Sequence, residues 1–254
     1  MRGHCADHPE PLAPTLVIAL DVPSAKAGLD LAGLLRPVTP WMKVGLELFT
    51  AAGPGIVKEL KGMGCRVFLD LKFHDIPNTV RGAVRSAHAS GADIINVHLC
   101  GGRAMCEAAV NELAKVGEAP ENRAPCLMLG VTVLTSVAAD APDADLSLEG
   151  GASLEELVLK RARHAREWGL QGVVCSALEV RAVKQACGKD FVCLCPGIRP
   201  ERGEVPDDQS RAVTPAEAAQ EGADFLVVGR PVTLAGNPLA AAKNIVRSMS
   251  AVRY

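Results

Sequence analysis

Residues 70–75 (DLKFHD) bring two carboxylates, an ammonium group and an imidazole together in one short segment. If the chain forms a β-strand over residues 66–72, its side chains alternate between two faces, and Asp70 and Lys72 share one of them. A carboxylate and an ammonium group held side by side keep each other ionised. With Asp75 as a second carboxylate nearby, the lysine stays protonated, which argues against Schiff-base chemistry, because that needs a neutral amine. The alternative is a purely structural ion pair, although buried charge contributes little to stability.

Two further segments have the composition of an anion-binding site. They are residues 196–199 (PGIR) and 228–231 (VGRP), and each follows an apolar run. Glycine lets a backbone N–H approach an anion closely, and the guanidinium groups of Arg199 and Arg230 offer planar sets of donors. A turn glycine beside a surface arginine explains either segment alone. Together, at the ends of the last two strands of a barrel, they favour a phosphate site that includes Gly229.

Other polar side chains also stand at the ends of apolar runs. They are Asp21, Lys43, Asn96, His98, Thr132 and Thr135. Any one of them is explained as a strand-end residue that faces solvent, but the same end is polar on strand after strand, which favours a shared site. His98 could act as a base, although a core histidine is the simpler explanation, and Thr132 fits ordinary β-strand preference. We assign His74 no distinct role.

The elements that must position these side chains are eight short apolar runs, each followed by a helical stretch. The runs cover residues 16–21, 41–45, 66–72, 93–98, 126–134, 172–176, 191–196 and 224–229. Repeated βα units form parallel sheets, and nearly continuous apolar runs are typical of strands covered on both faces. Eight units in 254 residues predict an α/β fold, a single (β/α)8 (TIM) barrel, with its site at the carboxyl ends of the strands. A doubly wound open sheet is the alternative, but it usually has fewer strands, and no GxGxxG follows the first run.

Helix and loop signals between the runs support this organisation. Capping boxes at residues 153–156 (SLEE) and 214–217 (TPAE) predict two helix starts, and Asn237 followed by proline predicts a third. Residues 140–151 are acidic and rich in turn formers, so we expect a loop that extends from the fifth strand. We expect residues 1–14 to form a flexible tail and residues 15–254 to form the barrel, with no linker inside it.

The composition excludes several classes of protein. Hydrophobic residues make up 48% of the chain and charged residues 22%, which suits a sizeable core and not a disordered chain. A formal net charge of −2 and 3% aromatic residues disfavour nucleic-acid binding. No apolar run has the length of a membrane span, and the N-terminus lacks the apolar region of a signal peptide. Nine cysteines in mostly apolar surroundings favour reduced thiols in the cytoplasm, and for the CxC pair Cys193 and Cys195 buried thiols are favoured over zinc.

From about Leu16 to Val246 the sequence resembles the orotidine 5′-monophosphate decarboxylase family, in particular its bacterial-type branch. The segment DLKFHDIPNTV at residues 70–80 carries the resemblance most specifically. The other segments are LVIALD (16–21), KVGLELF (43–49), NVH (96–98), VTVLTS (131–136), GVVCS (172–176), PGIRP (196–200), DDQSR (207–211) and VVGRPVT (227–233). The resemblance implies a (β/α)8 homodimer that converts orotidine 5′-monophosphate to UMP and CO2, the last step of de novo UMP synthesis. It also implies that no metal and no organic cofactor is needed.

The resemblance also implies roles for individual residues. Lys72 matches the lysine that protonates C6 of the pyrimidine, and Asp70 matches the carboxylate beside the departing CO2. Asp75 matches an aspartate that crosses the dimer interface into the other subunit's site, with Thr79 near it. The remaining matches are Asp21 and Lys43 for the ribose and the charged array, Thr135 for the pyrimidine, Gln209 for the link between base and phosphate, and Arg199, Gly229 and Arg230 for the phosphate.

The chain departs from the family pattern at Cys195, where threonine is expected, and in the acidic segment 140–151; we expect catalysis to be intact. Two other functions stay open. One is another phosphate-binding barrel enzyme, such as a 3-keto-L-gulonate 6-phosphate decarboxylase or a ribulose-phosphate epimerase, both metal-dependent. The other is a catalytically inactive barrel that binds a partner. The expected base contacts of Thr135 and Gln209 favour the nucleotide, and the intact cluster around Lys72 argues against the inactive barrel.

Overall fold

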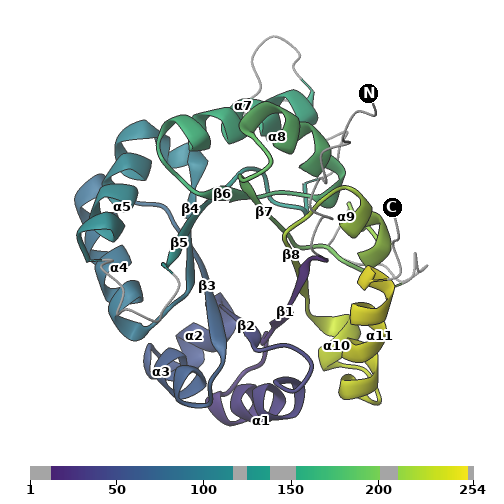
Figure 1. The fold of residues 1–254 in the computed structure, drawn as a ribbon. Helices are drawn as coiled ribbons and strands as arrows, with labels where there is room; N and C mark the ends of the chain where they lie inside the picture. The colour runs from purple at the N-terminus through teal and green to yellow at the C-terminus, as the bar shows by residue number, and fades with distance from the viewer. Residues whose placement is uncertain (1–12, 117–124, 138–152, 201–210, 251–254) are drawn as a thin grey trace, which may run out of the picture.

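Eight parallel strands close into a barrel in the computed structural model, with the helices around it (Figure 1). The structure describes residues 13–116, 125–137, 153–200 and 211–250. The strands are β1 (Thr15–Ala19), β2 (Trp41–Gly45), β3 (Arg66–Phe73), β4 (Ile94–His98), β5 (Leu127–Val131), β6 (Gly172–Val174), β7 (Val192–Cys195) and β8 (Phe225–Val228). The closed order from β1 to β8 confirms the predicted (β/α)8 barrel and excludes the open sheet.

The helices of the described residues follow the strands in the expected alternation. They are α1 (Ala25–Leu35), α2 (Leu46–Ala52), α3 (Gly55–Gly62), α4 (Pro77–Ser90), α5 (Gly102–Val116), α7 (Leu154–Glu167), α8 (Val180–Cys187), α9 (Pro215–Gln220), α10 (Arg230–Thr233) and α11 (Pro238–Ser250), with the short 3-10 helices η1 (Leu99–Gly101) and η2 (Ala177–Glu179). Figure 1 shows them as an outer ring that covers the barrel wall. Each strand is therefore covered on its outer face, which explains why the runs are apolar throughout.

Several strands end earlier than their apolar runs predict, and two of them, β1 and β5, matter for the site. β1 ends at Ala19 and β5 ends at Val131, short of the predicted residues 21 and 134. β5 cannot pair further along its length, because its neighbour β6 has only three residues, Gly172–Val174. Asp21 and Thr135 therefore stand on loops beyond the strand ends, where they can reach over the mouth of the barrel.

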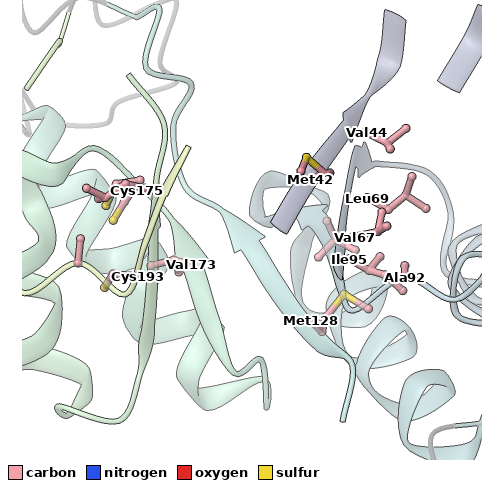
Figure 2. Packing of buried hydrophobic residues seen from close by; sticks show 14 of the residues in the cluster. Met42, Val44, Val67, Leu69, Ala92, Ile95, Met128, Val173, Cys175 and Cys193 are labelled. Carbon is pink, nitrogen blue, oxygen red and sulfur yellow. The ribbon is translucent and has the colours of Figure 1, made fainter. Parts of the chain in front are cut away.

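Two layers of apolar side chains fill the molecule, one inside the barrel and one between the strands and the helices. In β3, Phe68 belongs to the inner layer, whereas Val67 and Leu69 belong to the outer layer, which confirms the predicted alternation. Figure 2 shows part of the outer layer, where Val67 and Leu69 lie in one group with Met42 and Ile95. Asp70, next in the alternation after Phe68, is thereby directed towards the mouth of the barrel.

The predicted helix starts are confirmed where the structure describes them. The segments 153–156 and 214–217 each form a capping box with reciprocal bonds between the first and the fourth residue. Asn237 accepts a hydrogen bond of 3.0 Å from a backbone N–H in the first turn of α11. The expected loop at 140–151 and residues 1–12 of the expected tail lie outside the described residues.

Charged side chains join neighbouring strands at the amino-terminal end of the barrel. Asp93, just before β4, accepts from Val67 N at 2.8 Å and from Lys61 Nζ at 2.6 Å. Asp224, just before β8, accepts in the same way from a backbone N–H of β7 at 2.6 Å and from Lys184 Nζ at 2.7 Å. These charge-assisted bonds hold strands together at the end away from the mouth. None of these four bonds involves a residue of the predicted site.

The cysteines of the described residues are all free. Cys193 and Cys195 are both fully buried, as predicted for this CxC pair, and belong to the outer apolar layer. Within the described ranges, no three His, Cys, Asp or Glu side chains are grouped so that they could hold a metal ion. None of the helices in those ranges is long and apolar enough to cross a membrane.

Candidate active site

A cavity of about 580 Å³ lies at the carboxyl ends of the strands. Its floor consists of side chains from the inner layer, namely Ala19, Phe68, Val131, Val174, Leu194 and Val227. Its polar lining contains most of the predicted site residues, namely Asp21, Lys43, Asp70, Lys72, Thr135, Arg199, Gly229 and Arg230. The barrel thus gathers into one cavity residues that are distributed along the chain from position 21 to position 230.

Four charged side chains of alternating sign follow one another in this lining. Lys43 Nζ lies 2.7 Å from Asp21 Oδ1 and 3.7 Å from Asp70 Oδ2, and Lys72 Nζ lies 2.7 Å from Asp70 Oδ1. The side chains of Lys43 and Asp70 are only 10% and 12% exposed, whereas Asp21 is half exposed. Each ammonium group therefore has a carboxylate partner that fixes its position at the cavity wall.

The positive charges around Asp70 keep it ionised. Burial raises the pKa of this carboxyl group, but the ammonium groups of Lys43 and Lys72 and hydrogen bonds from Lys72 and Asn96 outweigh burial and bring the pKa below its usual value. Asp70 is thus a carboxylate at neutral pH. It can stabilise an ammonium group and raise the energy of a second anion that binds next to it.

The site contains Gly45, which we did not predict from the sequence, and Asn96, which we named only as one of the polar strand-end residues, without a role. Gly45 ends β2, and a Cβ atom there would lie 2.6 Å from Lys43 Nζ and 3.0 Å from Asp21 Oδ1, so glycine leaves room for this ion pair. Asn96 on β4 is fully buried and donates from Nδ2 to Asp70 Oδ1 at 2.7 Å. The polar character of Asn96 at the end of an apolar run is a signal in the sequence. Gly45 has no such signal, because only the contact in space identifies it.

The segments after β7 and β8 contribute cationic side chains next to glycines. Gly197 has a φ of 77°, a left-handed conformation that favours glycine, and lies two residues before Arg199. Gly229 is the residue before α10, which begins with Arg230. Thr135 also lines the cavity and is 7% exposed. Two guanidinium groups and backbone that glycine leaves accessible form a lining that can bind a phosphate.

Three predicted site residues do not line the cavity as the structure describes it. Asp75 and Thr79 are exposed, and Asp75 Oδ1 accepts the next backbone N–H along the chain at 2.6 Å. The sequence suggested that Lys72 lies between two carboxylates, Asp70 and Asp75. Within the described part of one chain, Lys72 contacts Asp70, and the lysine that contacts two carboxylates is Lys43. Gln209 lies outside the described residues.

His98 is half-buried rather than a core residue, and it is not part of the cavity lining found among the described residues. Its ring centroid lies 5.7 Å from that of His74. Burial lowers the pKa of His98, and the neighbouring His74, Lys72 and Arg161 lower it further. The lowered pKa favours the neutral form of His98 beside Lys72.

Comparisons with known proteins agree with the fold and show the family. A family model described as "Orotidine 5'-phosphate decarboxylase / HUMPS family" matches residues 14–245. The orotidine 5′-phosphate decarboxylase of Nitratidesulfovibrio vulgaris (strain DP4) is 55% identical over 94% of this chain and 98% of the relative, and that of Moorella thermoacetica is 48% identical over 94% and 93%. The crystal structure of the enzyme of the same name from Lactobacillus acidophilus superposes with a TM-score of 0.79 at 34% identity, over 94% of this chain and all of that one. The chain therefore belongs to the orotidine 5′-phosphate decarboxylase family.

Proposed function

We propose that this chain decarboxylates orotidine 5′-monophosphate to UMP and CO2, the last step of de novo UMP synthesis, without a metal or an organic cofactor. The observation that carries the proposal is the series of alternating charges from Asp21 through Lys43 and Asp70 to Lys72 in the cavity lining. Relatives that bear the name of this activity at 55% and 48% identity support the same substrate. The series provides the fixed positive charge that this reaction requires.

Decarboxylation breaks the bond between C6 of the pyrimidine and the carboxylate carbon and leaves the electron pair on C6. This pair occupies an sp2 orbital that the ring delocalises poorly, so its stabilisation must be electrostatic. We assign that stabilisation to the ammonium group of Lys72, which Asp70 holds at 2.7 Å in a site prepared before the reaction begins. Lys72 then transfers a proton from Nζ to C6, and water returns a proton to the amine.

Asp70 acts on the substrate carboxylate, which leaves C6 as CO2. Because the pKa of Asp70 is lowered, the group is an anion when the substrate carboxylate binds beside it. Repulsion between the two anions raises the energy of the bound ground state, and the departure of neutral CO2 relieves it. Lys43 contacts both Asp21 and Asp70, so it completes the array and, together with Asp21, holds the ribose.

The phosphate group binds at the loops after β7 and β8. We assign the phosphate to Arg199, Gly229 and Arg230, the pyrimidine to Thr135, and the link between base and phosphate to Gln209. Guanidinium groups form charge-assisted hydrogen bonds to phosphate oxygens. Binding energy from this remote group can hold the substrate in its reactive position and lower the barrier at C6.

The active unit in this proposal is an isologous homodimer in the cytoplasm. Asp75 and Thr79 of each subunit enter the other subunit's site, which explains why both are exposed and outside the cavity of their own chain. Ile76 between them is 67% exposed, as expected of an apolar residue that an interface covers. The free and mostly buried thiols of the described residues support a reducing compartment.

The test follows the loss of orotidine 5′-monophosphate absorbance in the presence of EDTA. We expect the wild type to be active with EDTA and Lys72→Ala to be inactive. Lys26→Ala serves as a matched control, because Lys26 pairs with Asp30 on the surface with its side chain 86% exposed, and it should keep full activity. Inhibition by EDTA would favour the metal-dependent phosphate-binding barrels. A folded wild type without turnover would favour the inactive binding barrel, and an active Lys72→Ala would refute the assigned mechanism.

A further inference from the structure

Lys72 has an unusual backbone conformation. Its φ is 51°, and it is the one non-glycine residue with positive φ among those that the structure describes. The pairing of β3 with β4 is irregular at the same place. Leu69 pairs with Ile95 and Phe73 pairs with Val97, so the segment between Leu69 and Phe73 is longer than the segment opposite it. A residue with a side chain stays in the left-handed region only where its surroundings hold it there.

Asn96 supplies the contacts that hold this irregular segment. It lies on β4 directly opposite the irregularity and is fully buried. Its Oδ1 atom accepts from Lys72 N at 2.8 Å, and its Nδ2 atom donates to Asp70 Oδ1 at 2.7 Å. One carboxamide thus replaces the regular strand-to-strand bond at Lys72 and fixes the carboxylate that pairs with Lys72 Nζ.

The residue type at position 96 fits both contacts. A carboxamide has an acceptor and a donor at the same distance from the backbone, and here one contacts an N–H and the other a carboxylate. Aspartate would keep the acceptor but would place a second negative charge against Asp70. Alanine would leave the N–H of Lys72 and one oxygen of Asp70 without this partner in a buried place, which is costly.

We propose that Asn96 is a positioning residue that holds the backbone of Lys72 and the carboxylate of Asp70, and thereby directs the ammonium group of Lys72 towards the reacting carbon. This inference rests on the function proposed above. Asn96 is not part of the cavity lining found among the described residues, so it acts through Asp70 and Lys72 and not on the substrate. Its loss should therefore affect the chemical step more than substrate binding, because Arg199, Gly229 and Arg230 remain in place.

The test compares Asn96→Ala and Asn96→Asp with Gln171→Ala by steady-state decarboxylation. Gln171 is a matched control, because its Oε1 atom also accepts a strand N–H, that of Met128, at 2.8 Å, but at the amino-terminal end of the barrel. We expect Asn96→Ala to lower kcat by about 100-fold, the effect of a small displacement of a reacting group, with KM changed less than threefold. Gln171→Ala should keep the kcat of the wild type. A crystal structure of Asn96→Ala should show Lys72 with negative φ.

The pH profile of kcat for Asn96→Asp is a second readout, and a merely structural role of Asn96 would leave it unchanged. The added carboxylate raises the pKa of Asp70, so the acid limb of the pH profile of kcat should shift to higher pH. The proposal is overturned if folded Asn96→Ala keeps the kcat of the wild type, or if Asn96→Asp loses activity with an unshifted profile. Failure of both variants to fold would also overturn it, in favour of a role in folding. An inactive wild type or an active Lys72→Ala would instead refute the proposed function itself.

Discussion

Mixing two inactive variants tests whether two subunits share one active site. Lys72→Ala removes the proposed proton donor, and Asp75→Asn removes a carboxylate that lies outside the cavity of its own chain. Asp75→Asn keeps the Oδ1 atom that accepts from Ile76 N at 2.6 Å, so the turn before α4 is preserved. If the protein is the homodimer proposed above, each variant alone should be inactive, because both sites carry the same defect. A mixed dimer has one site with both defects and one site with neither.

The expected recovery follows from counting sites. If equal amounts of the two variants reassemble at random, about half of the dimers are mixed, and each of these has one intact site out of two, by isologous geometry. Activity per total site should therefore approach about a quarter of the wild-type value. The assay mixes the variants, dissociates and reassembles the dimers, and follows the loss of orotidine 5′-monophosphate absorbance. Native mass spectrometry of size-tagged subunits measures the mixed fraction.

A second mixture provides the control. Lys72→Ala is mixed with Asp70→Asn, whose altered group lies 2.7 Å from Lys72 Nζ in the same chain. Every site in that mixed dimer lacks one of the two groups, so no activity should return. If the first mixture also stays inactive although subunit exchange is demonstrated, Asp75 acts within its own subunit or has no catalytic role, and the shared site is refuted.

Two more variants test the phosphate assignment and the ionisation of Asp70. Arg230→Ala should lower kcat/KM for orotidine 5′-monophosphate by about 10- to 150-fold, the loss of a hydrogen bond to a charged group worth about 1.5–3 kcal/mol, with little change for orotidine. Equal kcat/KM of the wild type for orotidine and its phosphate would contradict the phosphate assignment. Asp70→Asn tests the pH dependence of stability. Because the pKa of Asp70 is lowered on folding, its stabilising contribution is present above the unfolded pKa of about 4 and is lost as the pH falls below it. The difference in Tm between wild type and variant should therefore shrink from pH 6 to pH 3, and a constant difference would contradict the lowered pKa.

The sequence predicts the barrel well because its signals are local and repeated. Each apolar run needed only its own residues to be recognised as a strand, and each capping box needed only four. The direction of Asp70 also followed from alternation within one strand, with Phe68 below it in the inner layer. The sequence of one run does not show where a strand ends. β5 ends three residues before the predicted residue 134, because its partner β6 has only three residues to pair with.

The remaining features of the site depend on contacts between segments that are distant in the sequence. The conformation of Lys72 depends on β4 across an irregular ladder, and period-two alternation assumes a regular one. The room for the Lys43–Asp21 pair depends on the missing side chain of Gly45, which reads in the sequence as an ordinary turn residue. The expected place of Asp75 is in the site of a second chain. The only sign of it in the sequence is the resemblance to the family.

The left-handed conformation of Lys72 and the charge series occupy the same end of the barrel, and this coincidence has a physical reason. The irregular segment between Leu69 and Phe73 contains both residues of the Lys72–Asp70 pair, in which Lys72 Nζ donates to Asp70 Oδ1 two residues earlier in the chain. That geometry costs backbone strain, which persists only where neighbouring contacts oppose its relaxation. Asn96 opposes it directly. The bonds of Asp93 and Asp224 at the far end stabilise the strands themselves, so the mouth can keep a locally unfavourable arrangement of backbone and charge without loss of the fold.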